Sequence, residues 1–380
     1  MNPSVGIDLG TTNTVVAVQT GSMGPEIVSI SQPVDDRKHY DPIGRIKSAV
    51  YYESDSSCVV GEFAAAKQLD SFKSIKSWMG TRWRYPHPFK PTQSLTPSYL
   101  SAQILRVAYK ELVRQYPKWD KSAIITVPAS FNTDQRSDTL EAARLAGFET
   151  KNVRLLDEPT AAFYYYLDQN QGSIDAARIK KVLVFDFGGG TLDVSIIRVD
   201  ASVDRLVVDA IGRSRYTNLG GDDIDLDLAA FLASMWERQE HRLVTTLPHP
   251  IRRRVFKLFL RKACEYKEEV EDRIANNLPL NEFFVDETIG ANGEEVQIRL
   301  LRQFSREQYE ELTGRFFLPR EGINIFRPIG QALEVAKRFE PSLTKEAIDL
   351  ILYTGGGLTD EWGEGRPSSV FPTKGVLCDQ

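Results

Sequence analysis

Two segments of this chain, nearly half its length apart, share one pattern. In each, an apolar strand ends in an aspartate, a turn of glycine and threonine follows, and a second β-rich run begins. The first copy holds Asp8 and the turn 10–13, and the second holds Asp186 and the turn 188–191. Solenoid repeats recur every 20 to 50 residues or so. One repeat at this much longer spacing therefore predicts two similar lobes, each offering a turn to a shared cleft.

Strands and helices are expected to alternate around these turns, which predicts an α/β fold class. Short apolar or β-branched runs bounded by turn residues predict strands at 5–9, 14–18, 123–127, 181–186, 192–199, 206–211 and 348–353. Capping residues predict helices from 132 or 133 to 147, from 158 onward, and over 222–238, with a further charged helix over 250–275.

The repeat also predicts the domain organisation. Lobe I is expected over 1–180, with an inserted subdomain at about 34–98 that is rich in proline and aromatic residues. Lobe II is expected over 181–380, with an inserted subdomain at about 222–300. From about residue 358 the chain becomes rich in glycine, proline and serine, which predicts an irregular tail.

Composition excludes several classes of partner and site. A net charge of -5 gives no broad attraction to nucleic acid or to an anionic membrane. No apolar run is long enough for a membrane helix, and the first residues lack the pattern of a secretion signal. The three cysteines are far apart and form no metal or disulfide motif: Cys58, Cys264 and Cys378. We expect a cytoplasmic protein.

Glycine turns offer backbone N–H groups to phosphate oxygens without needing a basic patch. Three such turns occur, at 10–13, 188–191 and 355–357, whereas neither a P-loop nor a dinucleotide fingerprint is present. A single turn of this kind is more often ordinary hairpin chemistry, but two matched copies favour phosphate binding. In the same way, one aspartate at a strand end usually caps a turn, whereas the pair Asp8 and Asp186 favours a hydrated Mg²⁺ shared with phosphates.

Five segments, in order along the chain, resemble the signatures of the seventy-kilodalton heat-shock (DnaK-type) chaperones. They are 6–13 (Gly-Ile-Asp-Leu-Gly-Thr-Thr-Asn), 125–132 (Ile-Thr-Val-Pro-Ala-Ser-Phe-Asn), 157–162 (Asp-Glu-Pro-Thr-Ala-Ala), 185–194 (Phe-Asp-Phe-Gly-Gly-Gly-Thr-Leu-Asp-Val) and 219–225 (Leu-Gly-Gly-Asp-Asp-Ile-Asp). The resemblance implies the duplicated, ribonuclease H-like fold of the actin-like ATPase superfamily, with ATP or ADP and Mg²⁺ bound between the lobes.

The resemblance also implies roles for single residues. Asp8 and Asp186 would organise Mg²⁺, and Lys76 would reach the γ-phosphate and the attacking water. Glu158 and Asp193 would orient that water. The alternative for Lys76 is an exposed lysine, that for Glu158 a helix cap, and that for Asp193 a solvated strand end. Thr191 is expected both to contact phosphate and to take part in catalysis. The residues expected to hold the nucleotide are Gly10, Thr11, Thr12, Asn13, Gly188, Gly189, Gly190, Thr191, Gly220, Gly221, Gly355 and Gly356.

The function implied is slow ATP hydrolysis that couples nucleotide state to lobe closure and to protein partners such as a co-chaperone or a nucleotide-exchange factor. The chain departs from the family in two places. Thr359 stands where the adenosine pocket has an arginine. The substrate-binding domain expected next is not part of this sequence, as in a fragment, a natural truncation or a short family member acting through other partners, so we expect no trapping of unfolded peptides by this chain alone. Two other functions stay open: a nucleotide-responsive scaffold with little turnover, and a phosphotransferase of the sugar-kinase type.

Overall fold

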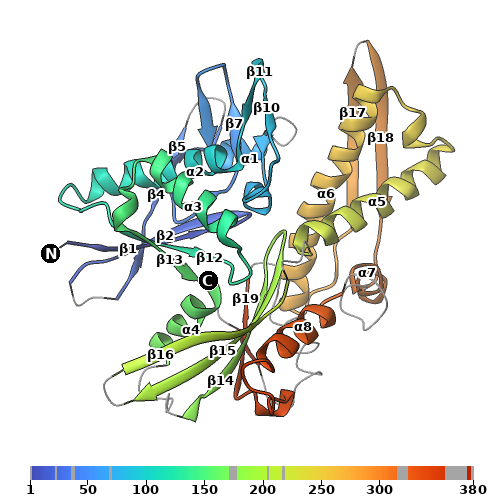
Figure 1. Cartoon of the computed structure of the whole chain (residues 1–380). Coiled ribbons are helices and arrows are strands. Elements are labelled where there is room, and N and C mark those ends of the chain that lie inside the picture. Colours follow the sequence, from blue (N-terminus) through green and yellow to red (C-terminus); the bar gives the residue numbers. More distant parts are fainter. Residues whose placement is uncertain are drawn as a thin grey trace.

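A computed structural model describes residues 2–21, 24–35, 39–67, 71–170, 178–202, 205–215, 219–291, 293–314, 324–355 and 375–377. Helices and strands alternate through these ranges, so the predicted mixed α/β class is confirmed (Figure 1). Within them no helix combines the length and the apolar character needed to cross a membrane. Apart from the short strand β20 (Gly375–Leu377), the predicted irregular tail lies outside the described residues.

The first sheet carries the first acid-and-glycine turn. Its strand order is β13-β12-β1-β2-β3, and β6 also pairs with β2. The bounds are β1 Ser4–Leu9, β2 Asn13–Gln19, β3 Glu26–Ile27, β6 Ile46–Lys47, β12 Ala123–Val127 and β13 Val153–Asp157. Alternate residues of β1 and β2 are buried, as expected for strands with one face on a core. Apolar side chains of α2 (Pro97–Gln115) and α3 (Thr133–Ala146) share that core.

The second sheet carries the second turn, in the order β16-β15-β14-β19-β20. The bounds are β14 Lys181–Phe187, β15 Leu192–Ser202, β16 Arg205–Arg213 and β19 Leu350–Thr354. Helix α4 (Glu158–Gln169) packs on one face of this sheet and α8 (Phe326–Ala336) on the other. Because both faces are covered, β14 and β19 are almost continuously apolar.

The two sheets have matching strand directions around the two aspartates. In each, the strand whose last residue but one is the aspartate is antiparallel to its hairpin partner and parallel to a later strand. Asp8 lies opposite Thr126 of β12, and Asp186 lies opposite Thr354 of β19. Helix α4 contacts strands of both sheets and lies between them in Figure 1.

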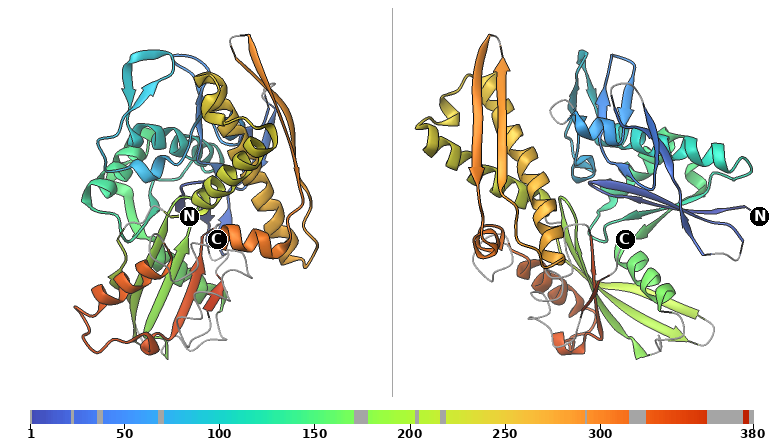
Figure 2. Two further views of the ribbon diagram at one scale, coloured as in Figure 1. Left: turned by 90° about the vertical axis from the view of Figure 1, so that its right-hand side faces the viewer. Right: turned by 180° about the vertical axis from the view of Figure 1, so that it is seen from behind.

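A third group of elements has its own core and extends upward from the second sheet, across from the elements of the first sheet (Figure 1; Figure 2, right). It comprises α5 (Gly221–Glu240), α6 (His249–Ala275), the hairpin β17 (Phe283–Ala291) and β18 (Glu294–Arg302), and α7 (Arg306–Thr313). One face of the hairpin is buried against the helices, since alternate residues of both strands are buried. The helix predicted over 250–275 is confirmed, whereas the hairpin was not anticipated.

The remaining short elements lie mostly between β3 and α2, and several of their side chains join the core of the first sheet. Their bounds are β4 Ile30–Pro33, β5 Tyr40–Ile43, β7 Val50–Tyr52, β8 Cys58–Val60, α1 Glu62–Ala66, β9 Ser71–Phe72, β10 Tyr85–His87, β11 Lys90–Leu95, and the 3₁₀ turns η1 Ile75–Trp78, η2 Thr150–Asn152, η4 Val244–Thr246 and η6 Lys345–Ala347.

The limits of α3 follow from local chemistry. The side chain of Asn132 accepts a hydrogen bond from the Gln135 amide, and the Asn132 amide donates one to Oε1 of the Gln135 side chain. At the other end Gly147 takes a left-handed conformation with φ 117°, which ends the helix. This confirms the predicted start and stop.

Glu271 makes the stability of the third group depend on pH. Burial, opposed by the Lys267 ammonium and assisted by Asp225 and Glu268, raises the pKa of Glu271 from 4.5 to about 7. Between about pH 4.5 and 7 the folded state keeps a proton that the unfolded chain has released, so the free energy of unfolding falls as pH rises through this window and does not recover above it. Glu271→Gln should raise the free energy of unfolding at pH 8 by about 3 kcal/mol.

The measurement is urea denaturation of both proteins at pH 5 and pH 8. The gain from Glu271→Gln should shrink to under about 1 kcal/mol at pH 5, which lies close to the pKa of the carboxyl in the unfolded chain. Glu282→Gln, an exposed glutamate between α6 and β17, is the matched control and should show no gain at either pH. An equal gain for Glu271→Gln at both values would contradict an ionisation effect.

Candidate functional site

The two glycine turns lie against each other. A Cβ atom added to Gly189 would stand 2.1 Å from Thr12 Oγ1, and one added to Gly190 would stand 3.2 Å from Thr11 Cγ2. Such approaches leave no room for a side chain on the second turn. The structure thus brings together two segments that are almost half the chain apart in sequence.

The first turn is held by the neighbouring strand segment. Ser48 donates its hydroxyl to the Gly10 carbonyl oxygen at 2.8 Å and its amide to the Thr12 carbonyl oxygen at 2.8 Å. Thr14 and Ser48 also share a hydroxyl hydrogen bond of 2.9 Å. Asn13 Oδ1 is buried and accepts no hydrogen bond from the described part of the chain. These contacts fix the turn while its own side chains keep some capacity for a ligand.

The second turn is held by the start of α5. The amides of Gly221 and Asp222 donate to the carbonyl oxygens of Gly188 and Gly189, at 3.1 and 2.6 Å. Inside the turn, the Gly188 amide donates to the Thr191 carbonyl oxygen at 2.9 Å. The predicted residues Gly220 and Gly221 therefore lie directly behind the turn and support it.

Gly355 approaches the same place from the end of β19. Its φ is 96°, and an added Cβ would stand 2.5 Å from the Phe187 carbonyl oxygen and 2.6 Å from Asp186 Oδ1. Glycine is the residue that tolerates both the angle and the contact. Gly356 and Thr359, also singled out from the sequence, lie outside the described residues.

Lys76 and Glu158 form an ion pair at the centre of the acidic residues. Lys76, on η1, places Nζ 2.6 Å from Oε1 of Glu158, at the start of α4, and the side chains are only 9% and 11% exposed. Burial would lower the pKa of Lys76, but the nearby carboxylates hold that pKa above its ordinary value. Lys76 is therefore a buried cation and not the exposed lysine of the alternative interpretation.

Burial raises the pKa of three acids at this site, Glu158, Asp186 and Asp193. It raises the pKa of Glu158, against the attraction of Lys76, and that of Asp193. Burial together with the charges of Glu158 and Asp193 raises the pKa of Asp186 well above its ordinary range. Asp8 is close enough to act on Lys76, Glu158 and Asp186. Four acids thus surround one ammonium group, which leaves an excess of negative charge.

This excess fits a divalent cation. Mg²⁺ usually keeps several waters and is held by one or two carboxylates together with phosphate oxygens. Asp8 and Asp186 suit that role, and Asp8 is oriented by the Thr126 hydroxyl, which donates to its Oδ1 at 2.8 Å. Among the described residues no three His, Cys, Asp or Glu side chains are placed to ligate one ion directly. A water-bridged ion agrees with both observations.

Several polar residues of the site were missed by the sequence analysis. Ser130 donates its hydroxyl to Asp193 Oδ2 at 2.7 Å, and Ser214 approaches Asp193 Oδ1 at 3.5 Å. Ser74, in a left-handed conformation, donates to Asp222 at 3.0 Å. Thr126 and Ser130 belong to the segment 125–132 that was singled out, but their partners lie far along the chain. Nothing in the sequence around Ser74 or Ser214 indicates such a contact.

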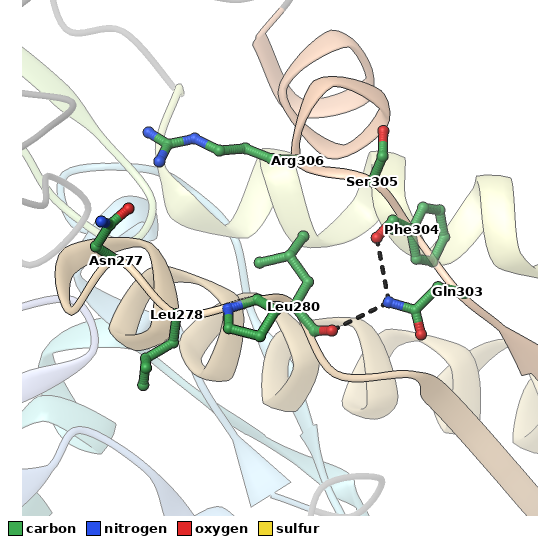
Figure 3. A pocket seen from close by; sticks show the side chains of 8 residues that line it. Asn277, Leu278, Leu280, Gln303, Phe304, Ser305 and Arg306 are labelled. Atoms are coloured by element: carbon green, nitrogen blue, oxygen red, sulfur yellow. Dashed lines mark hydrogen bonds between the residues drawn. The ribbon is translucent and has the colours of Figure 1, made fainter.

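A separate hollow of about 390 Å³ lies at the junction of the α6 end, the β18 end and the α7 start (Figure 3). Gln303 spans it and donates to the Leu280 carbonyl oxygen at 3.0 Å and to that of Phe304 at 3.4 Å. Its lining residues are Asn277, Leu278, Pro279, Leu280, Gln303, Phe304, Ser305 and Arg306. None of the predicted site residues is among them.

Comparison with known proteins agrees with the resemblance. The family model described as Hsp70 protein matches residues 87–357. A chaperone protein DnaK of Thermosipho africanus is 32% identical, over 99% of this chain and 56% of its own length. Chaperone protein dnaK3 of a Synechocystis species is 30% identical, over 94% of this chain and 44% of its own length. A chaperone protein dnaK of Cyanidioschyzon merolae is 29% identical, over 93% of this chain and 55% of its own length.

The chain thus spans about half the length of the curated relatives it matches. The match nonetheless extends over most of this sequence, including the second turn, the start of α5 and Gly355. The two opposed turns and the buried acids are the structural counterpart of the motifs that carry the resemblance. This chain belongs to the Hsp70 protein family.

Proposed function

We propose that this chain binds ATP or ADP with Mg²⁺ between two lobes, 1–180 and 181–380, and slowly hydrolyses ATP. One observation carries the proposal: two glycine turns, each following an acidic strand end, lie against each other beside a buried Lys76–Glu158 pair. In both sheets the strand that carries the aspartate has one antiparallel and one parallel neighbour, and this match supports a duplicated, actin-like fold. The inserted subdomains would be 34–98 and 222–300.

Different residues would bind the phosphates and the Mg²⁺ ion. Amides of the turns 10–13 and 188–191 would receive the phosphates, helped by the hydroxyls of Thr11, Thr12 and Thr191. The start of α5 places its positive helix end behind the second turn, which favours an anion there. Asp8 and Asp186 would hold Mg²⁺ through its waters, and the bound ion would neutralise charge on the phosphate oxygens.

The reaction would be in-line attack of water on the γ-phosphorus. Lys76 supplies positive charge where negative charge develops, and the buried environment strengthens that interaction. Glu158 and Asp193 orient the water, and their raised pKa values bring proton acceptance closer to neutral pH. Catalysis then comes mainly from positioning and charge neutralisation.

Nucleotide state would be coupled to the relative position of the lobes. Cross-lobe contacts at Ser74–Asp222 and Ser130–Asp193 offer a route for this coupling. The relatives are chaperones, so the partners proposed are a co-chaperone or a nucleotide-exchange factor in the cytoplasm. A scaffold that binds nucleotide with little turnover is the second candidate, because Lys76 is already paired with Glu158 and would have to leave that pair to reach a phosphate.

Thr191→Ala tests the proposal with the smallest disturbance. We expect calorimetry to show that the parent binds Mg·ATP, and a single-turnover assay to show that it releases phosphate. Thr191→Ala should slow that release about tenfold, because one hydrogen bond to a charged group is lost. The control Thr246→Ala, on the exposed turn η4, should match the parent. A parent that binds no nucleotide would refute the proposal, and one that binds without phosphate release would favour the scaffold.

A further inference from the structure

Both carboxylate oxygens of Asp193 are engaged by serines from different parts of the chain. Oδ2 accepts hydrogen bonds from the Ser130 hydroxyl at 2.7 Å and the Ser130 amide at 3.3 Å. Oδ1 lies 3.5 Å from the Ser214 hydroxyl. Asp193 is 7% exposed and stands directly opposite Asp186 in the hairpin β14–β15. Its carboxylate is therefore oriented by protein groups and not by solvent.

Ser130 is held rigidly by the elements on either side of it. It lies between β12 and α3, in a turn closed by the Phe131 amide, which donates to the Pro128 carbonyl oxygen at 3.0 Å. Next to it, the Arg213 guanidinium donates to the Ala129 carbonyl oxygen at 3.0 Å. The loop that carries Ser130 is thus tied both to its own sheet and to the end of β16.

Ser214 is held from the other side. Its amide donates to the Val194 carbonyl oxygen at 2.8 Å, and its hydroxyl oxygen accepts from the Val194 amide at 3.1 Å. The hydroxyl proton stays available for Asp193, one residue before Val194. Ser214, directly after β16, is therefore tied to β15 of the second sheet, whereas Ser130 approaches from the first.

We propose that Ser130 is a positioning residue for the hydrolysis, and that with Ser214 it holds Asp193 at the angle needed to orient the attacking water. The proposal rests on the proposed function and assigns it a further residue. Because Ser130 comes from the first half of the chain and Asp193 from the second, this orientation exists only while the two halves are in contact. Separation of the lobes would remove both Ser130 hydrogen bonds from Oδ2, leave only Ser214 on the carboxylate, and slow the reaction.

The physical reason lies in the geometry of a short carboxylate. An aspartate with no partner on one oxygen rotates freely about its last torsion, which is broad and roughly two-fold. A reacting group displaced by about 1 Å loses on the order of a hundredfold in rate. Loss of the Ser130 hydroxyl leaves the weaker amide bond in place, so a smaller loss is expected from that change alone.

The test separates rate from binding. Ser130→Ala should lower the single-turnover rate at saturating Mg·ATP about tenfold while ATP and ADP affinities stay within about twofold. Ser130→Thr keeps the hydroxyl and should recover most of the rate. Ser234→Ala removes a partly buried hydroxyl on α5 that donates to the Phe231 carbonyl oxygen and accepts from the Arg238 guanidinium, and should match the parent. Ser214→Ala should slow the reaction less than Ser130→Ala.

Three results would overturn the proposal: a parental rate for Ser130→Ala, an equal loss of rate and affinity, or no recovery in Ser130→Thr. A parent without hydrolysis would defeat the proposed function instead. In that case the ¹³C resonance of the Asp193 carboxyl, measured in nucleotide-free protein, tests the Ser130–Asp193 contact independently of hydrolysis. A change of that resonance in Ser130→Ala but not in Ser130→Thr supports the positioning contact, and an unchanged resonance in both overturns it.

Discussion

Lys76→Met is expected to lower the rate of phosphate release from Mg·ATP by about 100- to 1000-fold, the loss typical of one donor that stabilises developing charge. Lys76 is the one cation that the described structure places among Asp8, Glu158, Asp186 and Asp193. Methionine keeps most of the length and the apolar stem of lysine but supplies no charge. Single-turnover phosphate release at saturating nucleotide measures the loss.

The same substitution should also destabilise the fold. Removing one partner of a buried ion pair leaves the other charge without compensation, at about 3 to 5 kcal/mol, and Glu158 is only 11% exposed. The raised pKa of Glu158 reduces this cost, because the carboxyl can take up a proton once Lys76 is gone. Adding Glu158→Gln to Lys76→Met should therefore recover stability, but not hydrolysis.

A matched lysine separates the two effects. Lys181, at the start of β14, pairs with Glu340 at 3.0 Å, away from the turns. Lys181→Met should destabilise by at most about 1 kcal/mol, because the pair is partly exposed, and should leave hydrolysis unchanged. If Lys76→Met retained the parental rate, Lys76 would have a structural role only, and the reaction proposed here would lose its main source of positive charge.

The sequence predicted those parts of the fold that depend on residues close together in the chain. Asn132 and Gly147 mark the ends of α3 by their own backbone chemistry. The alternation in β1 and β2, and the continuous apolar run in β14, follow from whether one or both faces are covered. For the same reason both turns could be found, since each follows its aspartate within a few residues.

Local sequence patterns could not predict contacts between segments that are far apart in the chain. A serine such as Ser130 or Ser214 has no sequence feature that names Asp193 as its partner, because the pairing depends on how two sheets are placed. The burial of Lys76 likewise depends on α4 and β14, which follow much later in the chain. The hairpin β17–β18 was not predicted, although alternate residues of both strands are buried.

Gly220→Ala is expected to lower the free energy of unfolding by about 3 kcal/mol and to displace the second turn. A Cβ at residue 220 would stand 2.5 Å from the Gly189 carbonyl oxygen and 2.7 Å from that of Gly188. These are backbone atoms that cannot rotate away, so overpacking must be relieved by movement of the chain. The hydrogen bond from the Asp222 amide to Gly189 would lengthen as α5 moves back.

The comparison with Gly330→Ala isolates this close approach. Gly330 lies on the exposed side of α8 with nothing within 4 Å of an added Cβ, so the same chemical change should stabilise by up to about 1 kcal/mol through helix propensity. Urea denaturation should give opposite signs for the two variants. If Gly220→Ala instead unfolded like the parent and bound Mg·ATP equally well, α5 would not support the turn, and its helix end would have no part in holding phosphate.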